Sequence, residues 1–179
     1  MALRPDLDIQ PLRGNLDTRL RKLDEGQYDA IVLAAAGLKR LGLSERIRAV
    51  IEPTDMLPAA GQGALGIEIR ADQTELHAAL ASLTDRATWL AVHAERAVSR
   101  ALGGSCSMPL AAYARWQGDT LHLDALLGHP SDPSQALIRA SVSGQPADTA
   151  TADAMGLAAA EMLRSQGGAV LLAALEPVA

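Results

Sequence analysis

The sequence predicts an α/β partial domain built from parallel-type βα units, followed by an α+β domain with a three-stranded antiparallel sheet packed on helices. In the first third of the chain, short apolar runs alternate with leucines at helical spacing, which is typical of a parallel sheet covered on both faces. In the second half, three strand-like segments lie between a long helical pattern and an alanine-rich one. A chain of 179 residues is long enough to bury a hydrophobic core in one or two domains.

Caps and apolar runs define the elements of the first third. Asn15 is a good N-cap for a helix that ends at Gly26. Residues 29–34 then predict a buried strand, and a short helix follows through Leu38. Residues 49–51 predict a second short strand, so the expected order is helix, strand, helix, strand.

The middle of the chain predicts a connector, a strand and a helix. Residues 53–66 hold two prolines and three glycines and are expected to connect folded parts. Residues 64–70 have a strand-like pattern, and residues 75–83 predict a helix with three leucines on one face. A domain boundary is expected near residue 84, because Asp85 can cap the helix that follows.

The second half predicts a small sheet between helices. Apolar and polar residues alternate along its first two strands, and Gly118-Asp119 between them is suited to a two-residue hairpin turn. The closing helix is rich in alanine. The expected helices and strands cover residues 85–102, 110–117, 121–127, 137–143 and 149–164.

Composition and charge exclude several classes of protein. The formal net charge is −5 and the sequence pI is about 5.3, which argues against nucleic acid or an anionic membrane as the main partner. The single cysteine fits a reducing compartment, and the first residues lack the apolar stretch of a secretory signal. The longest apolar run, residues 30–38, is too short to span a bilayer. A cytoplasmic protein is therefore expected.

Cys106 is the only cysteine, and it follows Gly103, Gly104 and Ser105 where a helical pattern ends. A lone thiol cannot form an intrachain disulfide. Three roles remain open for it: an inert core residue, a nucleophile, or the covalent anchor of a cofactor. The neighbouring glycines predict a loop, and functional residues are often found on loops.

Two arginines and four histidines are further candidates for binding roles. Arg13 and Arg19 flank a predicted helix start, where guanidinium groups and free backbone N–H groups suit carboxylates or phosphates. Spacing alone favours solvated surface arginines, because arginines are common at such positions. No histidine is paired with another histidine or with a cysteine at ligand spacing, so no metal site is expected. The histidines are His77, His93, His122 and His129.

Residues 61–66, Gly-Gln-Gly-Ala-Leu-Gly, match the dinucleotide-binding fingerprint letter for letter. The fingerprint requires a preceding strand and a following helix, whereas Pro58 lies just before this segment and a strand pattern follows it. A crossing with close approach of the backbone is the better interpretation, in which Gln62 could offer its side-chain amide to a ligand.

Several segments form one combined pattern in order along the chain. They are Arg13-Gly14-Asn15 with Thr18-Arg19, residues 28–31 and 36–41, residues 57–63, Glu95-Arg96, and Gly103-Gly104-Ser105-Cys106 with Pro109. Together they resemble the porphobilinogen deaminase family, whose members are also called hydroxymethylbilane synthases. Ser105 and Met108 depart mildly from the family pattern. The combination is much more specific than any one of its segments.

The resemblance implies an activity and a cofactor. Members of this family join four porphobilinogen units head to tail, release ammonia at each step, and produce hydroxymethylbilane for tetrapyrrole and heme biosynthesis. They hold a dipyrromethane cofactor through a thioether on the loop cysteine, a role that falls here to Cys106, with Gly103, Gly104 and Ser105 as its loop. A soft sulfur nucleophile suits the electron-poor carbon that the loss of ammonia leaves.

The resemblance also assigns carboxylate-binding residues. Each pyrrole carries an acetate and a propionate, so a growing chain accumulates negative charge. The family context therefore reverses the preference for surface roles and implies that Arg13 and Arg19 bind cofactor or substrate carboxylates, with Gln62 nearby. It implies no nucleic acid, membrane or metal partner.

The resemblance further implies a C-terminal fragment of the family's chain. Residues 1–63 correspond to the later part of the second domain, residues 64–84 to the return segment of the first domain and a linker, and residues 85–179 to the cofactor-attachment domain. No segment matches the family's catalytic aspartate, so the chain alone is expected to lack turnover. Family members are usually monomeric, but unpaired edges at residues 64–70 would favour self-association.

Two alternatives remain open from the sequence. One is a non-catalytic tetrapyrrole-binding or assembly module, in which Cys106 serves only packing. The other is a nucleotide-binding protein that uses residues 61–66, against which the surrounding sequence argues.

Overall fold

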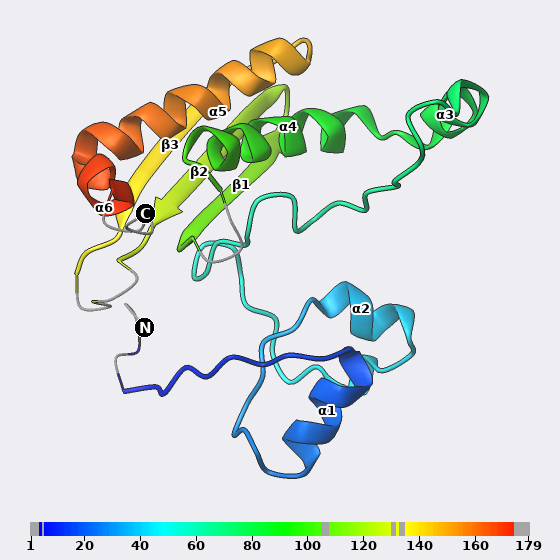
Figure 1. The fold of residues 1–179 in the computed structure, drawn as a ribbon, viewed down its shortest axis with the longest axis vertical. Helices are drawn as coiled ribbons and strands as arrows, with labels where there is room; N and C mark the ends of the chain where they lie inside the picture. The colour runs from blue at the N-terminus through cyan, green and yellow to red at the C-terminus, as the bar shows by residue number, and fades with distance from the viewer. Residues whose placement is uncertain (1–3, 5, 105–107, 130–131, 133–134, 174–179) are drawn as a thin grey trace. The chain divides into compact units, whose positions relative to one another are not determined.

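A computed structural model describes residues 4, 6–104, 108–129, 132 and 135–173 of the chain (Figure 1). The chain divides into two compact units, of which the first ends at Glu52 and the second begins at Pro53. Each unit has its own secondary structure, and the main hydrophobic core lies in the second unit.

The first unit consists of short helices joined by extended chain. Helix α1 spans Leu16–Asp24, α2 spans Ala35–Arg40, and a 3-10 turn, η1, spans Ser44–Arg46. The side-chain oxygen of Asn15 accepts a hydrogen bond from the Thr18 N–H at 2.9 Å, so the predicted N-cap is confirmed. Both helices that were predicted for this unit are present.

The strands predicted at residues 29–34, 49–51 and 64–70 are absent from the structure. The described strands all belong to one sheet near the C-terminus. Side chains expected in a buried parallel sheet are exposed instead, with Val32 at 66% and Leu65 at 81%. A strand needs a neighbouring strand to pair its backbone N–H and C=O groups, and the described residues supply none for these segments. The predicted sheet of βα units is therefore not formed.

The second unit begins with an exposed helix and continues with a long one. Helix α3 spans Thr74–Leu80 and continues as a 3-10 turn, η2, at Ala81–Leu83, and no residue of either element is buried. Helix α4 spans Arg86–Ala101, and the Asp85 side chain caps it by accepting the Thr88 N–H at 2.8 Å. The two helices predicted around residue 84 and the cap between them are confirmed.

A three-stranded antiparallel sheet follows α4. Strand β1 spans Leu110–Gln117, β2 spans Thr120–Leu127 and β3 spans Ile138–Gly144, in the spatial order β1-β2-β3. In the hairpin turn between β1 and β2, Gly118 has a φ of +57°, a conformation that favours glycine. The predicted sheet and its hairpin are confirmed.

Helices close the described chain. Helix α5 spans Thr149–Leu163, and Asp148 and Thr151 form a capping box at its start. A π-type turn, η3, at Arg164–Gly168 and a short helix, α6, at Ala169–Ala173 follow. The predicted alanine-rich helix is confirmed. None of the described helices is both long and apolar enough to cross a membrane.

Helices α4 and α5 cover one face of the sheet, and the core lies between these two layers (Figure 1). Gly156 of α5 approaches α4 so closely that an added Cβ would lie 2.3 Å from the Ala94 carbonyl oxygen and 2.5 Å from the Ala97 Cβ. Small side chains on both helices permit this approach, which accumulates dispersion contacts. The largest fully buried side chains of the sheet are Leu121, Leu123 and Leu127.

Candidate functional site

The predicted cofactor loop begins at the end of α4. Cys106 and Ser105 lie outside the described residues, whereas Gly103 and Gly104 are described. Gly103 has a φ of +76°, and the Gly104 N–H donates to the Ser99 carbonyl oxygen at 2.7 Å. These features define a glycine-terminated helix end, in which a left-handed residue turns the chain away from the helix axis.

Glycine is required at positions 103 and 104 for two different physical reasons. Gly103 adopts a left-handed conformation that residues with a Cβ rarely take. Gly104 has no room for a side chain, since an added Cβ would lie 2.0 Å from the Ser99 Oγ and 2.7 Å from the Ser99 carbonyl oxygen. The direction in which the chain leaves α4 therefore depends on this glycine pair.

Glu95 is a buried carboxylate in the middle of α4. It is 5% exposed and is the one buried polar or charged residue found in the described part of the chain. Its Oε2 accepts a hydrogen bond from the Gly61 N–H at 2.7 Å, and its Oε1 accepts one from the Ala114 N–H at 2.8 Å. Burial raises the pKa of the Glu95 carboxyl, and the hydrogen bonds from Ala114 and Gly61 offset only part of that effect.

The contacts of Glu95 belong to a set that covers the outer edge of β1. Strand β1 is an edge strand, because the sheet order is β1-β2-β3. The Ala112 N–H donates to the Pro58 carbonyl oxygen at 3.3 Å, and the Ala114 N–H, two residues further on, donates to Glu95. Alternate residues of an edge strand direct their N–H groups away from the sheet. Residues 58–61 and Glu95 thus pair groups that an open edge would leave free.

Gln62 follows this anchored segment and is exposed. Gly61 before it has a φ of +76°, and the Gln62 N–H donates to the Ala59 carbonyl oxygen at 3.1 Å, so the chain turns tightly here. The Gln62 side chain makes no hydrogen bond with another described residue, which leaves its amide accessible to a ligand. Residues 61–66 have neither a strand before them nor a helix directly after them, so they lack the structural context of a dinucleotide site.

One face of α4 meets two of the predicted site segments. An added Cβ at Gly61 would lie 3.9 Å from the Val92 Cγ1 and 4.0 Å from the Arg96 Cγ, so these side chains flank Gly61. Ser99, which contacts Gly104, is three residues beyond Arg96. Residues three or four apart lie on the same face of a helix, about one turn from each other. Helix α4 therefore holds both segments on one face at neighbouring turns.

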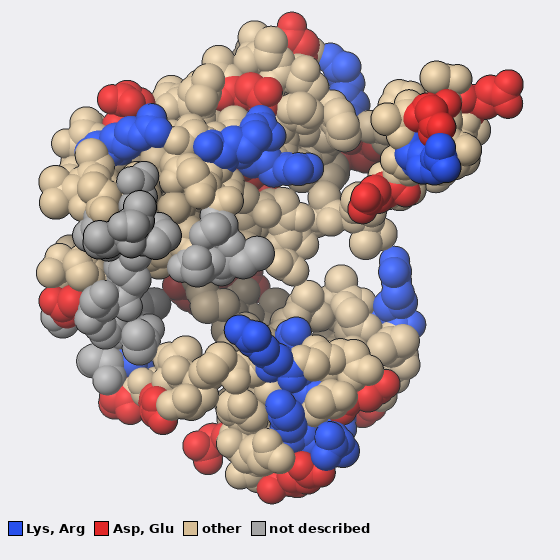
Figure 2. All heavy atoms as spheres, in the orientation of Figure 1, with Lys and Arg blue, Asp and Glu red and all other residues tan. Residues whose placement is uncertain are grey.

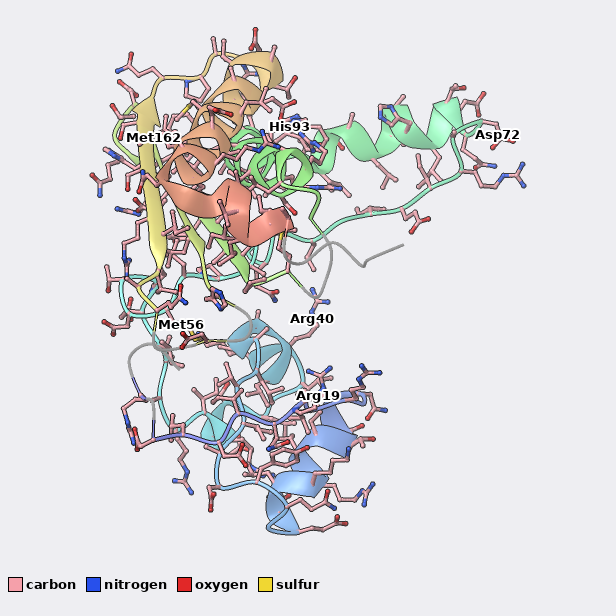
Figure 3. The ribbon with its side chains drawn as sticks, turned by 60° about the vertical axis from the view of Figure 1, so that its left-hand side comes forward. Arg19, Arg40, Met56, Asp72, His93 and Met162 are labelled. Atoms are coloured by element: carbon pink, nitrogen blue, oxygen red, sulfur yellow. The ribbon has the colours of Figure 1, made fainter. Side chains whose placement is uncertain are left out.

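Arg13 and Arg19 lie at the start of α1 in the first unit, and Arg19 projects from this helix in Figure 3. The Arg19 Nε donates to the Gly14 carbonyl oxygen at 2.8 Å. Gly14 has a φ of +124°, and an added Cβ would lie 2.8 Å from the Thr18 Cγ2. Glycine is therefore required at this position, between Arg13 and the start of α1. Neither arginine forms an ion pair with another described residue. Their remaining N–H groups can bind carboxylates.

The surface of the first unit carries mixed charge. Figure 2 shows several Lys and Arg side chains on its visible face, with Asp and Glu side chains around them. A local group of cations can attract an anionic ligand even though the net charge of the chain is −5.

The histidines make separate local contacts. The His93 Nδ1 lies 3.1 Å from the Asp153 Oδ1, and the His93 ring contacts the Trp89 ring at a centroid distance of 4.8 Å. The His122 Nδ1 lies 2.8 Å from the Ser143 Oγ. Within the described ranges, no group of three or more His, Cys, Asp or Glu side chains could hold a metal ion.

Glu95 was not predicted as a site residue, although the sequence contains a signal for it. Ala91, Glu95, Val98 and Leu102 recur at spacings of three or four, so Glu95 occupies a position in the buried stripe of α4. A charged residue in an apolar stripe requires hydrogen-bond partners. Its partners come from segments distant in the sequence, which no local pattern identifies.

Two family models match most of the chain. The model described as "Porphobilinogen deaminase, dipyromethane cofactor binding domain" matches residues 1–78, and the one described as "Porphobilinogen deaminase, C-terminal domain" matches residues 89–165. The predicted carboxylate-binding residues fall within the first match, and Cys106 falls within the second.

Curated relatives named porphobilinogen deaminase align with nearly the whole chain. The relative from Albidiferax ferrireducens is 63% identical over 176 residues, which are 96% of this chain and 56% of the relative. The relative from Paraburkholderia phytofirmans is 56% identical over 171 residues, 96% of this chain and 49% of the relative. The relative from Burkholderia thailandensis is 56% identical over 174 residues, 97% of this chain and 52% of the relative. The chain thus spans about half the length of these relatives.

Proposed function

The chain belongs to the porphobilinogen deaminase family, and on this premise we propose that it contributes to the synthesis of hydroxymethylbilane from porphobilinogen in tetrapyrrole and heme biosynthesis. Four porphobilinogen units would be joined head to tail, and one ammonia would leave with each unit. Because the chain spans about half the length of its relatives, we assign to it the part of this activity that holds the cofactor and binds carboxylates.

The cofactor in this proposal is dipyrromethane, attached to Cys106 through a thioether. When bound, it supplies the two pyrrole rings on which the product chain grows. The described donor groups fit such a ligand, because Arg13, Arg19 and Gln62 keep N–H groups that no described residue accepts. Guanidinium and amide N–H groups are suited to acetate and propionate carboxylates. The Cys106 sulfur, as a thiolate, is a soft nucleophile suited to a lasting bond with an electron-poor carbon.

The observation that carries this proposal is the arrangement of two site segments on one face of α4. Gly103 and Gly104 set the direction of the chain as it leaves the helix toward Cys106. Gly61, bound by Glu95 about one turn before Ser99, is followed by the exposed Gln62. One helix thus holds the glycine pair that precedes Cys106 in the sequence and an amide that makes no hydrogen bond with a described residue, which suits a ligand that is both covalently attached and polyanionic.

We further propose that the catalytic carboxylate lies in the half of the family's length that this chain does not span, so that the chain alone lacks turnover. Residues 1–63 would then be the later part of an α/β domain, residues 64–84 a return segment and linker, and residues 85–179 the cofactor-attachment domain. The absence of strands before β1 in the described residues supports this division, since those strands would need partners from elsewhere. Self-association through residues 64–70 would follow from the same unpaired groups.

Intact mass spectrometry of the full chain and of Cys106→Ser tests the proposal. After incubation with preformed hydroxymethylbilane, the parent should gain the mass of the four-ring chain less one water, because the Cys106 sulfur displaces the hydroxyl group. Cys106→Ser should gain nothing because it lacks the sulfur. An adduct that survives the substitution would refute the role of Cys106. A tetrapyrrole that binds reversibly, with no adduct on the parent, would instead favour the non-catalytic binding module.

A further inference from the structure

We propose that Glu95 is a positioning residue, whose ionised carboxylate holds Gly61 against the outer edge of β1 and thereby sets the position of Gln62. This inference rests on the proposed function in one respect, namely that Gln62 binds a ligand carboxylate. The attachment of the 58–61 segment by Glu95 stands on hydrogen bonds within the second unit alone.

The chemistry of the two hydrogen bonds requires an acceptor on both carboxyl oxygens. Oε2 faces the Gly61 N–H at 2.7 Å and Oε1 faces the Ala114 N–H at 2.8 Å. An ionised carboxylate is an acceptor at both oxygens, whereas a protonated one carries an O–H on one of them. Hydrogen bonds that involve a charged group are also stronger than neutral ones. The carboxylate form of Glu95 is therefore the form that can hold Gly61 and Ala114 together.

Without Glu95, one backbone hydrogen bond between described residues would still join the segment to β1. That bond joins the Ala112 N–H to the Pro58 carbonyl oxygen at 3.3 Å, near the long end of the range for such bonds. The Ala114 N–H would then face the interior without an acceptor, which is costly for a buried donor. Glu95 thus supplies both the second attachment of the segment and the pairing of the strand edge.

The position of Gln62 follows from the attachment of Gly61. Gly61 has a φ of +76° and is flanked by Val92 and Arg96, so its N–H and its Cα side are both fixed by α4. The next residue, Gln62, projects from this turn and is exposed. Because Ser99 on the same face of α4 holds Gly104, the helix sets the spacing between Gln62 and the start of the cofactor loop.

Hydrogen exchange of single amides tests the attachment directly in the full chain. In Glu95→Gln, one carboxyl oxygen becomes an NH₂ donor, so at least one of the Gly61 and Ala114 amides should exchange roughly tenfold faster or more. The matched control is Glu161→Gln on α5, which makes the same chemical change at a side chain that is 73% exposed and should leave both amides unchanged. Unchanged exchange of both amides in Glu95→Gln would overturn the proposal.

A measurement on the parent keeps the test valid if Glu95→Gln does not fold. Scalar couplings across hydrogen bonds should connect the Glu95 Cδ to the amide nitrogens of Gly61 and Ala114. Glu95→Asp, which keeps the charge but shortens the side chain, should lose at least one of these couplings. Absence of both couplings in the parent would overturn the attachment.

The role of Gln62 is tested by a double-mutant cycle on the rate of adduct formation at Cys106 with hydroxymethylbilane. If Glu95 acts through Gln62, then Gln62→Ala and Glu95→Gln should each slow the reaction several-fold, and the double variant should be no slower than Gln62→Ala. If the two substitutions slow adduct formation independently, so that their effects multiply in the double variant, then Glu95 is only structural. A parent that forms no adduct would overturn the proposed function and the role of Gln62 with it, while the amide data would still decide the attachment.

Discussion

The two units of the molecule differ in how completely their backbone groups and apolar side chains find partners. In the second unit from α4 onward, helices and strands close in sequence supply each other's contacts, and side chains such as Leu123 are fully buried. Residues 64–70 of the same unit form no strand, and Leu65 there is 81% exposed. In the first unit, helices form but Val50 remains 62% exposed and no described residue forms a strand. A helix satisfies its backbone within one segment, whereas a strand depends on a neighbour. The comparison thus separates elements that are paired within the described residues from segments that have no strand partner among them.

The largest expected effect comes from adding the half of the relatives' length that the chain does not span. We expect that joining the chain to the part of the Albidiferax ferrireducens relative that it does not span will slow amide exchange at Ile67 and Ile69 by about a hundredfold or more, because paired strand amides exchange only through opening. Exchange at Leu123, already in the sheet, should change little and serves as the control. Equal exchange at Ile67 in both proteins would show that residues 64–70 do not form a strand.

A smaller effect is expected from the same substitution in a helix of each unit. Gly156→Ala should lower the free energy of unfolding by about 1–3 kcal/mol, because the new Cβ would overlap α4. Gly37→Ala in α2 meets no atom within 4 Å and should raise helix stability by up to about 1 kcal/mol. Urea denaturation followed by far-ultraviolet circular dichroism measures both variants. A destabilised Gly37→Ala with an unaffected Gly156→Ala would reverse the comparison.

The smallest effects concern the pH dependence of the second unit. For Asp124, burial raises the pKa, but hydrogen bonds from Ser141 and Arg115 outweigh it, so the pKa is lowered overall. A carboxyl with a lowered folded-state pKa contributes stability above its unfolded-state pKa, and this is lost as pH falls through the folded value. Asp124→Asn should therefore reduce the loss of stability on acidification, as measured by urea unfolding at a series of pH values.

Glu95 should contribute a pH dependence of the free energy of unfolding that has the opposite sign. Its pKa is raised by burial, so ionisation costs the folded state more than the unfolded state, and the free energy of unfolding falls as pH rises from the ordinary carboxyl value through the raised one. Glu95→Gln removes this slope. If the difference between the parent and Glu95→Gln does not change with pH across that window, then burial does not control this carboxyl.

Local signals account for the parts of the fold that were predicted correctly. Asn15 and Asp85 cap helices through hydrogen bonds that span three residues, and Gly118 sets a turn between adjacent strands. The strands expected at residues 29–34 and 49–51 failed because their partners are not local, so an apolar run alone could not decide between a strand and exposed chain.

The candidate site shows the same division between local and distant information. The sequence predicted that the helical pattern ends at Gly103 and Gly104, and α4 does end there, at Ala101. Glu95 binds groups that are 34 and 19 residues away, at Gly61 and Ala114, so only the folded structure identifies its role. Whether Arg13 and Arg19 share a ligand with Cys106 stays a prediction from the family resemblance.

Turnover of porphobilinogen tests the central claim most directly. The chain should release no ammonia and form no hydroxymethylbilane alone, whereas the protein completed with the uncovered part of the Albidiferax ferrireducens relative should do both, and its Cys106→Ser variant should do neither. Turnover by the chain alone, or equal turnover with and without the Cys106 sulfur, would contradict the account.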